Sequence, residues 1–319
     1  MEIGSFIDLE LPVGHEYYSR IKNVARLNTG RAAIYHAAKT LCANTVWLPH
    51  YQCETVRNFL GKKGIEVKYY RIDNAFNPLN IEQKDGEAVV IVNYFGIMSK
   101  KRLQSLAKQY KNVIIDNSQS FFTAPIKGAM NVYSARKFVG APDGAYVIGE
   151  GAQNGVGDYP LCHSSDTSAF LLMRSEYGCE GRGYEARNIN EDRIDNEDIM
   201  QMSALTRKIL DGADYKKNIS KRKENFKTAD KLFRDINKID ARMYYDKSCV
   251  PMVYPLVVED DELLGKMLKN KHFQGHWWAY VRNEVPEDSF EYWLSRYIIP
   301  ITIDQRYGRE ELEFLRSIV

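Results

Sequence analysis

Four polar residues follow two short apolar segments of the chain. Asp116 comes directly after Val113–Ile115, and Gln119 lies three residues further on. Ser134 ends a second apolar segment, and Lys137 lies three residues after it. Because the carboxyl ends of parallel strands meet at one edge of a sheet, we expect these four side chains to lie close together. That edge is where open α/β sheets hold their ligands.

The four residue types suit one kind of chemistry. A lysine amine can form a Schiff base with an aldehyde once its surroundings disfavour its charged form. A buried carboxylate can keep a pyridinium nitrogen protonated, which makes pyridoxal phosphate an electron sink, while a serine hydroxyl and backbone amides can bind phosphate. Each residue taken singly has an ordinary explanation too: Lys137 could be a solvated surface residue, and Asp116 a cap or turn residue. Their spacing as a set favours the catalytic interpretation.

The segment Asn112–Gly144 resembles the core motif of the DegT/DnrJ/EryC1/StrS family, pyridoxal-phosphate-dependent sugar aminotransferases of fold type I, which is aspartate aminotransferase-like. The likeness lies in an aspartate-x-x-glutamine pair, then a serine and a lysine, then a glycine-rich stretch. It covers about Asn28 to Ser203, and the C-terminal part more loosely. The resemblance implies that Lys137 is catalytic and holds the cofactor. It also implies that Asp116 faces the ring nitrogen, Gln119 the ring's hydroxyl edge, and Ser134 the phosphate.

A helix N-terminus is predicted at Thr29-Gly30, before the segment AAIYHAAKTL. The first amides of a helix are unpaired and make a ready anion site, although an ordinary cap is the commoner meaning of this pattern. By the resemblance, Thr29, Gly30 and Arg31 surround the cofactor phosphate, mostly through backbone amides. Arg31 stands where the family usually has a small hydroxyl residue, so the role of its side chain stays open.

The resemblance implies two further roles, for which the residues of this sequence match the family pattern less well. The residue that covers the cofactor ring follows Pro49, and both Tyr51 and Cys53 are candidates, between which the sequence does not decide. The family's partner subunit usually contributes an asparagine to the phosphate shortly before a Met-Ser pair. Met202-Ser203 is present, but the asparagine spacing is not, and Asn196 is the nearest candidate.

Composition excludes several classes of protein. The chain has 319 residues, a hydrophobic share of 44% and a net charge of +2, which give no reason to expect a nucleic-acid or membrane partner. Its five cysteines are odd in number and lack CxxC spacing, which argues for a reducing compartment and against a disulfide framework or metal site. No secretory signal or apolar run long enough for a membrane helix is evident, so we expect a soluble cytoplasmic protein.

Alternating strand and helix patterns from residue 28 to 148 predict the fold class α/β, with a mainly parallel mixed sheet, helices on both faces and a smaller α+β C-terminal domain. Residues 1–27 are predicted to form an extended arm with one short helical turn, and a helix is predicted from Ile199 to Leu210. The domains are expected at 15–212, the large cofactor-binding domain, and at 213–319, the small domain, to which the N-terminal arm at 1–14 is added. Residues 149–195 carry seven glycines and many polar residues. They are predicted to be irregular, either a binding loop or disordered. The resemblance to fold type I enzymes implies that part of this region lies at a homodimer interface.

The leading functional hypothesis is an aminotransferase that converts a nucleotide-linked ketosugar to an aminosugar for surface polysaccharide, with an amino acid donor such as glutamate. A sugar 3-dehydratase of the same family would carry histidine in place of Lys137. A cofactor-binding regulatory protein with lost activity stays possible, whereas a dinucleotide oxidoreductase lacks its GxGxxG fingerprint. Trp277 and Trp278 could line the substrate mouth, with core packing the commoner role for tryptophan.

Overall fold

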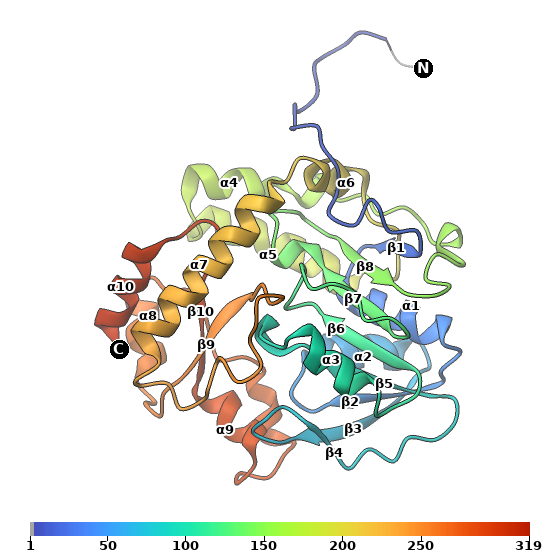
Figure 1. Ribbon diagram of the computed structural model, residues 1–319. Helices are drawn as coiled ribbons and strands as arrows, with labels where there is room; N and C mark the ends of the chain where they lie inside the picture. The colour runs from blue at the N-terminus through green and yellow to red at the C-terminus, as the bar shows by residue number, and fades with distance from the viewer. Residues whose placement is uncertain (1–2) are drawn as a thin grey trace.

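The computed structural model describes residues 3–319, and within them an eight-stranded sheet has the order β1-β8-β7-β6-β5-β2-β3-β4 (Figure 1). Its central strands β7, β6, β5, β2 and β3 are parallel. Strand β8 is antiparallel to both of its neighbours, and β4 is antiparallel to β3. The strands are β1 (Val24–Leu27), β2 (Thr45–Pro49), β3 (Glu66–Ile72), β4 (Pro78–Leu79), β5 (Glu87–Val92), β6 (Val113–Asn117), β7 (Met130–Ser134) and β8 (Ala145–Ile148).

The strand order changes direction between β2 and β5. From β2 the chain passes through α2 (Glu54–Lys62) outward to β3, whereas from β5 it passes through α3 (Lys100–Ala107) the other way, to β6. Right-handed crossovers in opposite directions put their helices on opposite faces of the sheet. Helix α1 (Gly30–Thr40) packs beside α2, and α3 lies on the other face (Figure 1). The carboxyl ends of β2 and β5 therefore form a switch point, where such sheets bind ligands.

Continuous apolar runs account for the central strands. Every residue of β5, β6 and β7 is buried, which is the pattern of strands covered on both faces. Helix α2 presents Val56, Phe59 and Leu60 to the sheet and its charged residues to solvent. The apolar segment Val113–Ile115, predicted to be a strand, forms β6 together with the two residues that follow it, and the predicted segment that ends in Ser134 forms β7.

The C-terminal part contains a two-stranded antiparallel sheet flanked by helices. Its elements are α7 (Tyr215–Phe233), β9 (Val253–Val257), α8 (Leu263–Lys269), α9 (Phe290–Tyr297), β10 (Ile298–Thr302) and α10 (Arg309–Ile318). Its apolar residues join the same core as the large sheet. The predicted architecture, a mainly parallel sheet plus a smaller α+β part, is confirmed, while the division at residues 212 and 213 stays a prediction.

Three sequence predictions need correction. Residues 24–27, predicted to belong to an extended arm, form β1 and pair with β8; the first two residues of that arm lie outside the described range. Residues 149–195, predicted to be irregular, contain the helices α4 (Ala169–Tyr177) and α5 (Gly181–Asn196). The helix expected from Ile199 begins only at α6 (Ala204–Asp211), because Ser203 caps it through its side chain. None of the helices in residues 3–319 combines the length and the apolar character needed to cross a membrane.

Candidate active site

A cavity of about 230 Å³ lies beyond the carboxyl ends of the central strands. Most of the predicted site residues line it, namely Thr29, Gly30, Arg31, Cys53, Asp116, Gln119, Ser134 and Lys137. Tyr51 and Asn196 are not among its lining residues. We call the strand ends that carry Asp116, Ser134 and Lys137 the pocket floor. We call the residues of α5 that line the same cavity, Glu191, Ile194 and Asp195, the pocket wall.

Asp116 is held in one orientation at the end of β6. Its Oδ2 accepts a hydrogen bond from Nε2 of Gln52 at 2.9 Å, and its Oδ1 accepts one from the Ser118 backbone N–H at 2.9 Å. The residue is only 5% exposed. The carboxylate is therefore oriented before any ligand binds, while the buried Oε1 of Gln52 has no hydrogen-bond partner within residues 3–319. Gln52 was not recognised in the sequence, although it directly precedes Cys53.

Gln119 is oriented by a neighbouring loop. The backbone N–H of Phe95 donates to Oε1 of Gln119 at 2.5 Å, which fixes the direction of the amide. Phe95 has a φ of +59°, so the loop after β5 bends sharply at this point. Within residues 3–319 no hydrogen bond forms at Nε2 of Gln119. The amide therefore offers a donor to a ligand.

A small hollow lies at the N-terminus of α1. Thr29 caps this helix by accepting the Ala32 N–H at 3.2 Å, while the amides of Gly30 and Arg31, in the first turn, have no partner within the helix. A Cβ atom added at Gly30 would lie 3.3 Å from Oγ of Ser118 and 3.9 Å from Cβ of Ser134. The absence of a side chain at Gly30 thus leaves room beside two hydroxyl-bearing residues. Amides, hydroxyls and the positive end of a helix together suit a phosphate.

Lys137 ends a short 3₁₀ turn that follows β7. Its side chain is exposed, and within the described residues it forms no ion pair or hydrogen bond. Its neighbour Arg136 is by contrast paired with Glu191 of α5. The Lys137 amine therefore lines the same cavity as Asp116 without a competing partner among the described residues.

The two candidates for covering a ring lie in different places. Cys53, at the start of α2, lines the cavity, whereas the ring of Tyr51 is fully buried behind it. Burial raises the pKa of Tyr51 well above its ordinary value, so its hydroxyl is neutral, and this hydroxyl has no hydrogen-bond partner among the described residues. Trp278, for which core packing was the commoner expectation, also lines the cavity.

The pocket wall brings two carboxylates to the cavity, and each is paired with an arginine. Nη1 of Arg31 lies 2.7 Å from Oδ1 of Asp195, and Arg136 pairs with Glu191. The Arg31 side chain, whose role the sequence left open, therefore ties the start of α1 to α5. The carboxylates of the wall were not recognised as site residues, because nothing in the sequence places α5 against the strand ends.

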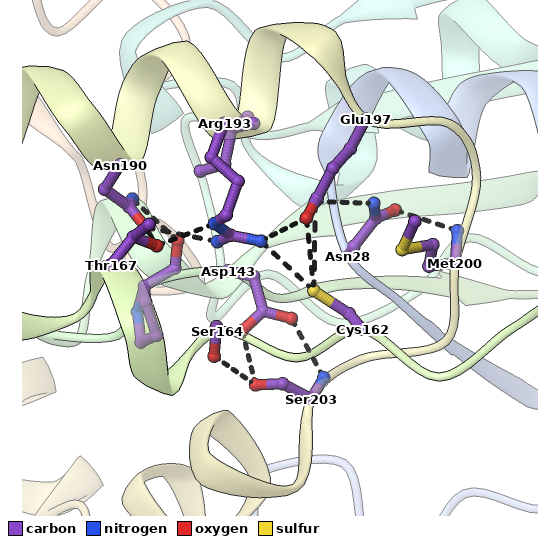
Figure 2. A network of polar contacts seen from close by, with 12 residues as sticks. Asn28, Asp143, Cys162, Ser164, Thr167, Asn190, Arg193, Glu197, Met200 and Ser203 are labelled. Atoms are coloured by element: carbon purple, nitrogen blue, oxygen red, sulfur yellow. Dashed lines mark hydrogen bonds and ion pairs between the residues drawn. The ribbon is translucent and has the colours of Figure 1, made fainter.

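A polar network fixes the end of α5 (Figure 2). Nε of Arg193 donates to Oγ1 of Thr167 at 2.7 Å, and its Nη1 donates to Oε1 of Glu197 at 2.5 Å and to Sγ of Cys162 at 3.3 Å. Asn190 donates to the Pro142 carbonyl at 3.0 Å. The network therefore joins α5 to the loops that flank β8.

Asn196 lies at the exposed end of α5, outside the cavity of its own chain. Its Nδ2 donates to the Asp192 carbonyl at 2.8 Å. Its expected role concerned the phosphate of a partner subunit, and it stays a prediction.

The residues present fit pyridoxal phosphate. An oriented carboxylate, an amide donor, a hollow lined by hydroxyls and helix amides, and a free amine surround one cavity. These are the groups needed to meet a pyridinium nitrogen, a ring hydroxyl, a phosphate and an aldehyde.

Comparison with known proteins finds solved structures of similar fold but no match by sequence. No family model matches the sequence, and no curated protein matches it either. Among solved structures, a DegT DnrJ EryC1 StrS aminotransferase from Brucella abortus is similar, with a TM-score of 0.61 and 13% identity over 93% of this chain and 85% of that one. The sugar aminotransferase CalS13 from Micromonospora echinospora is similar with a TM-score of 0.60 and 16% identity, over 94% of this chain and 88% of that one. The E. coli GDP-4-keto-6-deoxy-D-mannose-3-dehydratase with bound hydrated PLP is similar with a TM-score of 0.62 and 14% identity, over 93% of this chain and 87% of that one. At such low identity the likeness establishes the fold alone: the chain has the aspartate aminotransferase-like fold type I.

Proposed function

We propose that the protein is a pyridoxal-phosphate-dependent aminotransferase that converts a nucleotide-linked ketosugar to an aminosugar, with an amino acid such as glutamate as donor. One observation carries the proposal: the Lys137 amine and the Asp116 carboxylate line the same cavity as the hollow at Gly30. The structures of similar fold support the substrate class, since they include sugar aminotransferases and a structure with the PMP form of the cofactor.

Each polar residue of the cavity has a separate task in this proposal. The cofactor, when bound, supplies an electron sink for charge that develops on the substrate carbon. Asp116 would keep a proton on the ring nitrogen, and Gln119 would donate from Nε2 to the ring's hydroxyl edge. Ser134, Ser118 and the amide of Gly30 would bind the phosphate.

Lys137 would have two tasks. Its Nζ would hold the cofactor covalently in the resting protein, and once released by the amino donor it would act as a base that moves a proton from the substrate carbon. A base must lie within hydrogen-bond reach of the proton it takes, and Lys137, on the short turn after β7, lines the same cavity as Asp116.

The cellular setting is proposed on wider grounds. The aminosugar would serve surface polysaccharide synthesis in the cytoplasm, and the protein would act as a homodimer. Exposed apolar side chains on α4 and α5 support a dimer, because solvent-facing groups of this size mark interaction surfaces when they gather. They are Leu172, Tyr177, Tyr184 and Ile189.

The test uses the full-length protein and two lysine variants. We expect pyridoxal phosphate to give a yellow species that Lys137→Ala lacks and that Lys127→Ala, a matched change at an exposed lysine, retains. Reduction with borohydride followed by peptide mass analysis should place the added mass on the peptide that contains residue 137. Colour retained by Lys137→Ala, or mass on another lysine, would contradict the proposal.

A second measurement separates an enzyme from a cofactor-binding protein without activity. Incubation with glutamate should convert the yellow form to the pyridoxamine form, and a ketosugar should restore it. A colour that persists through incubation with a panel of amino acids would favour the regulatory alternative.

A further inference from the structure

A short aromatic segment of the C-terminal part reaches the pocket from far along the chain. Trp277 stacks on Phe95 with ring centroids 5.6 Å apart, and Trp278 meets Tyr51 edge to face at 4.6 Å. The hydroxyl of Tyr280 donates to the Gln52 carbonyl, across 228 residues of sequence. Three successive contacts thus clamp this segment onto the loops that follow β2 and β5.

The residues under this segment are the ones that orient the polar groups of the cavity. Gln52 donates to the Asp116 carboxylate at 2.9 Å, and the Phe95 N–H donates to Gln119 at 2.5 Å. The aromatic segment therefore packs against the supports of both groups that would meet the cofactor ring.

Trp278 has an unusual backbone conformation. Its φ of +57° and ψ of +49° lie in the left-handed region, which is rare for a bulky residue. Such conformations persist only where the surroundings impose them, and they gather at ligand sites. Here the stacked Trp277 on one side and the anchored Tyr280 on the other hold the chain in this turn.

Trp278 is the only aromatic residue among the described residues that line the cavity. Of the two candidates after Pro49 for covering the ring, only Cys53 lines the cavity, and it offers a small thiol in place of a flat surface. Tyr51 is fully buried and lies against the indole of Trp278, so it supports the indole without lining the cavity. A planar heterocycle that binds here would find an aromatic neighbour only at Trp278.

We propose that Trp278 is the aromatic cover of the cofactor ring, a task that the segment after β2 does not perform in this chain. The inference rests on the proposed function, because it assumes that pyridoxal phosphate occupies the cavity. It also assigns the C-terminal part a direct share in cofactor binding.

The experiment compares apoprotein of three full-length variants by titration with pyridoxal phosphate, followed by absorbance. Trp278→Leu should raise the apparent dissociation constant about tenfold, the size expected when a ring–ring contact is lost. Trp278→Phe keeps an aromatic ring and should stay close to wild type. The matched control is Trp293→Leu, because this indole on α9 donates to Glu259 at 2.7 Å and does not line the cavity.

A second readout is tryptophan emission, which does not depend on Trp278→Leu folding normally. Pyridoxal phosphate should quench emission in wild type and in Trp293→Phe more strongly than in Trp278→Phe. Equal quenching in the two phenylalanine variants, or equal dissociation constants in all three titrated variants, would overturn the proposal. So would a Trp278→Leu protein that binds the cofactor normally and shows only a raised KM for the sugar.

The failure of this inference differs from that of the proposed function. Wild-type protein that forms no yellow species with pyridoxal phosphate would refute both. Wild-type protein that forms it at Lys137, with variants of Trp278 that bind equally well, would refute only the role of the indole.

Discussion

The pocket floor and the pocket wall differ in how deeply their elements are buried. The floor ends β6 and β7, strands in which every residue is buried. The wall belongs to a helical hairpin whose first helix, α4, has no buried residue, and whose second, α5, buries only Gly183, Asn190 and Ile194. Apolar burial fixes the floor, whereas hydrogen bonds and ion pairs fix the wall. Elements with few buried apolar contacts open most easily, so the wall is the part of the site expected to move.

The two regions also differ in how strongly their carboxylates can act on a ligand in the cavity. Asp116 of the floor is buried and held by two donors, whereas the Asp195 side chain of the wall is 57% exposed and paired with Arg31. A buried, oriented charge acts through a low dielectric, while an exposed ion pair is screened by water. Two carboxylates that line one cavity are therefore expected to differ greatly in their effect on activity.

The largest predicted effect comes from Asp116→Asn. An asparagine can accept from Gln52 or Ser118, but it cannot keep a positive charge on a ring nitrogen. We expect the rate of amino transfer from glutamate to fall roughly a hundredfold to a thousandfold, the cost of removing one oriented electrostatic group. The rate is measured by stopped-flow absorbance of the bound cofactor.

Asp195→Asn is the matched change in the wall. It removes one exposed ion pair, which is worth at most about 1 kcal/mol, so the rate should change less than about fivefold. Similar losses in the two variants would mean that the wall, and not only the floor, sets the electrostatics of the cavity.

The next largest effect is expected from Asp143→Ala, in the loop before β8, which is bonded to the start of α6. This fully buried carboxylate accepts from the Ser203 N–H at 2.9 Å, from the Ser203 hydroxyl at 2.7 Å and from Thr206. Its loss leaves three buried donors unsatisfied, and we expect the free energy of unfolding to fall by about 3 kcal/mol. Urea denaturation measures this change, with Asp192→Ala on the exposed face of α5 as control. A loss below about 1 kcal/mol would show that water replaces the carboxylate.

The same contrast explains what could be predicted from the sequence. The floor was predictable because continuous apolar runs such as Val113–Ile115 identify buried parallel strands, and polar residues at their ends must meet at one edge. The order of Asp116, Ser134 and Lys137 then placed the cavity. Strand β1 was missed because its four residues include an arginine and give too short a pattern to read.

The wall was not predictable for a physical reason. Helix α5 contains glycines and charged residues without an apolar face, so its sequence resembles a loop. Its stability comes from partners far along the chain, such as Arg31 and the Pro142 carbonyl. Trp278 was ambiguous for the same reason, since its place at the cavity depends on contacts with residues distant in sequence, such as Tyr51. The order of residue types along the chain indicates local secondary structure, whereas the roles of α5 and Trp278 depend on contacts with distant parts of the chain.

A smaller effect is expected from Arg193→Met, which removes the centre of the network in Figure 2. Helix α5 should loosen by about 1 to 3 kcal/mol, because Thr167 and Glu197 lose a charged donor. Hydrogen exchange should accelerate about tenfold or more in residues 181–196 and stay unchanged in β6. The control is Arg187→Met, an exposed arginine of the same helix. Equal acceleration in β6 would show that floor and wall open as one unit.

The smallest effect concerns Cys162, the thiol within that network. Burial, with Asp143 and Glu197 nearby, raises the pKa of Cys162 from its ordinary value of 9.0 to about 12. The folded protein therefore keeps this proton between pH 9 and 12 while the unfolded chain loses it, so the thiol's contribution to stability is complete below pH 9 and declines as the pH rises. The decline in the free energy of unfolding is at most about 1.4 kcal/mol per pH unit, the limit for one proton.

Urea denaturation from pH 8 to 11 should show a shallower decline in the stability of Cys162→Ala than in that of wild type, while Cys42→Ala, at an exposed thiol, should follow wild type. Identical slopes in all three proteins would mean that water reaches the thiol, and that the wall is open on the time scale of unfolding.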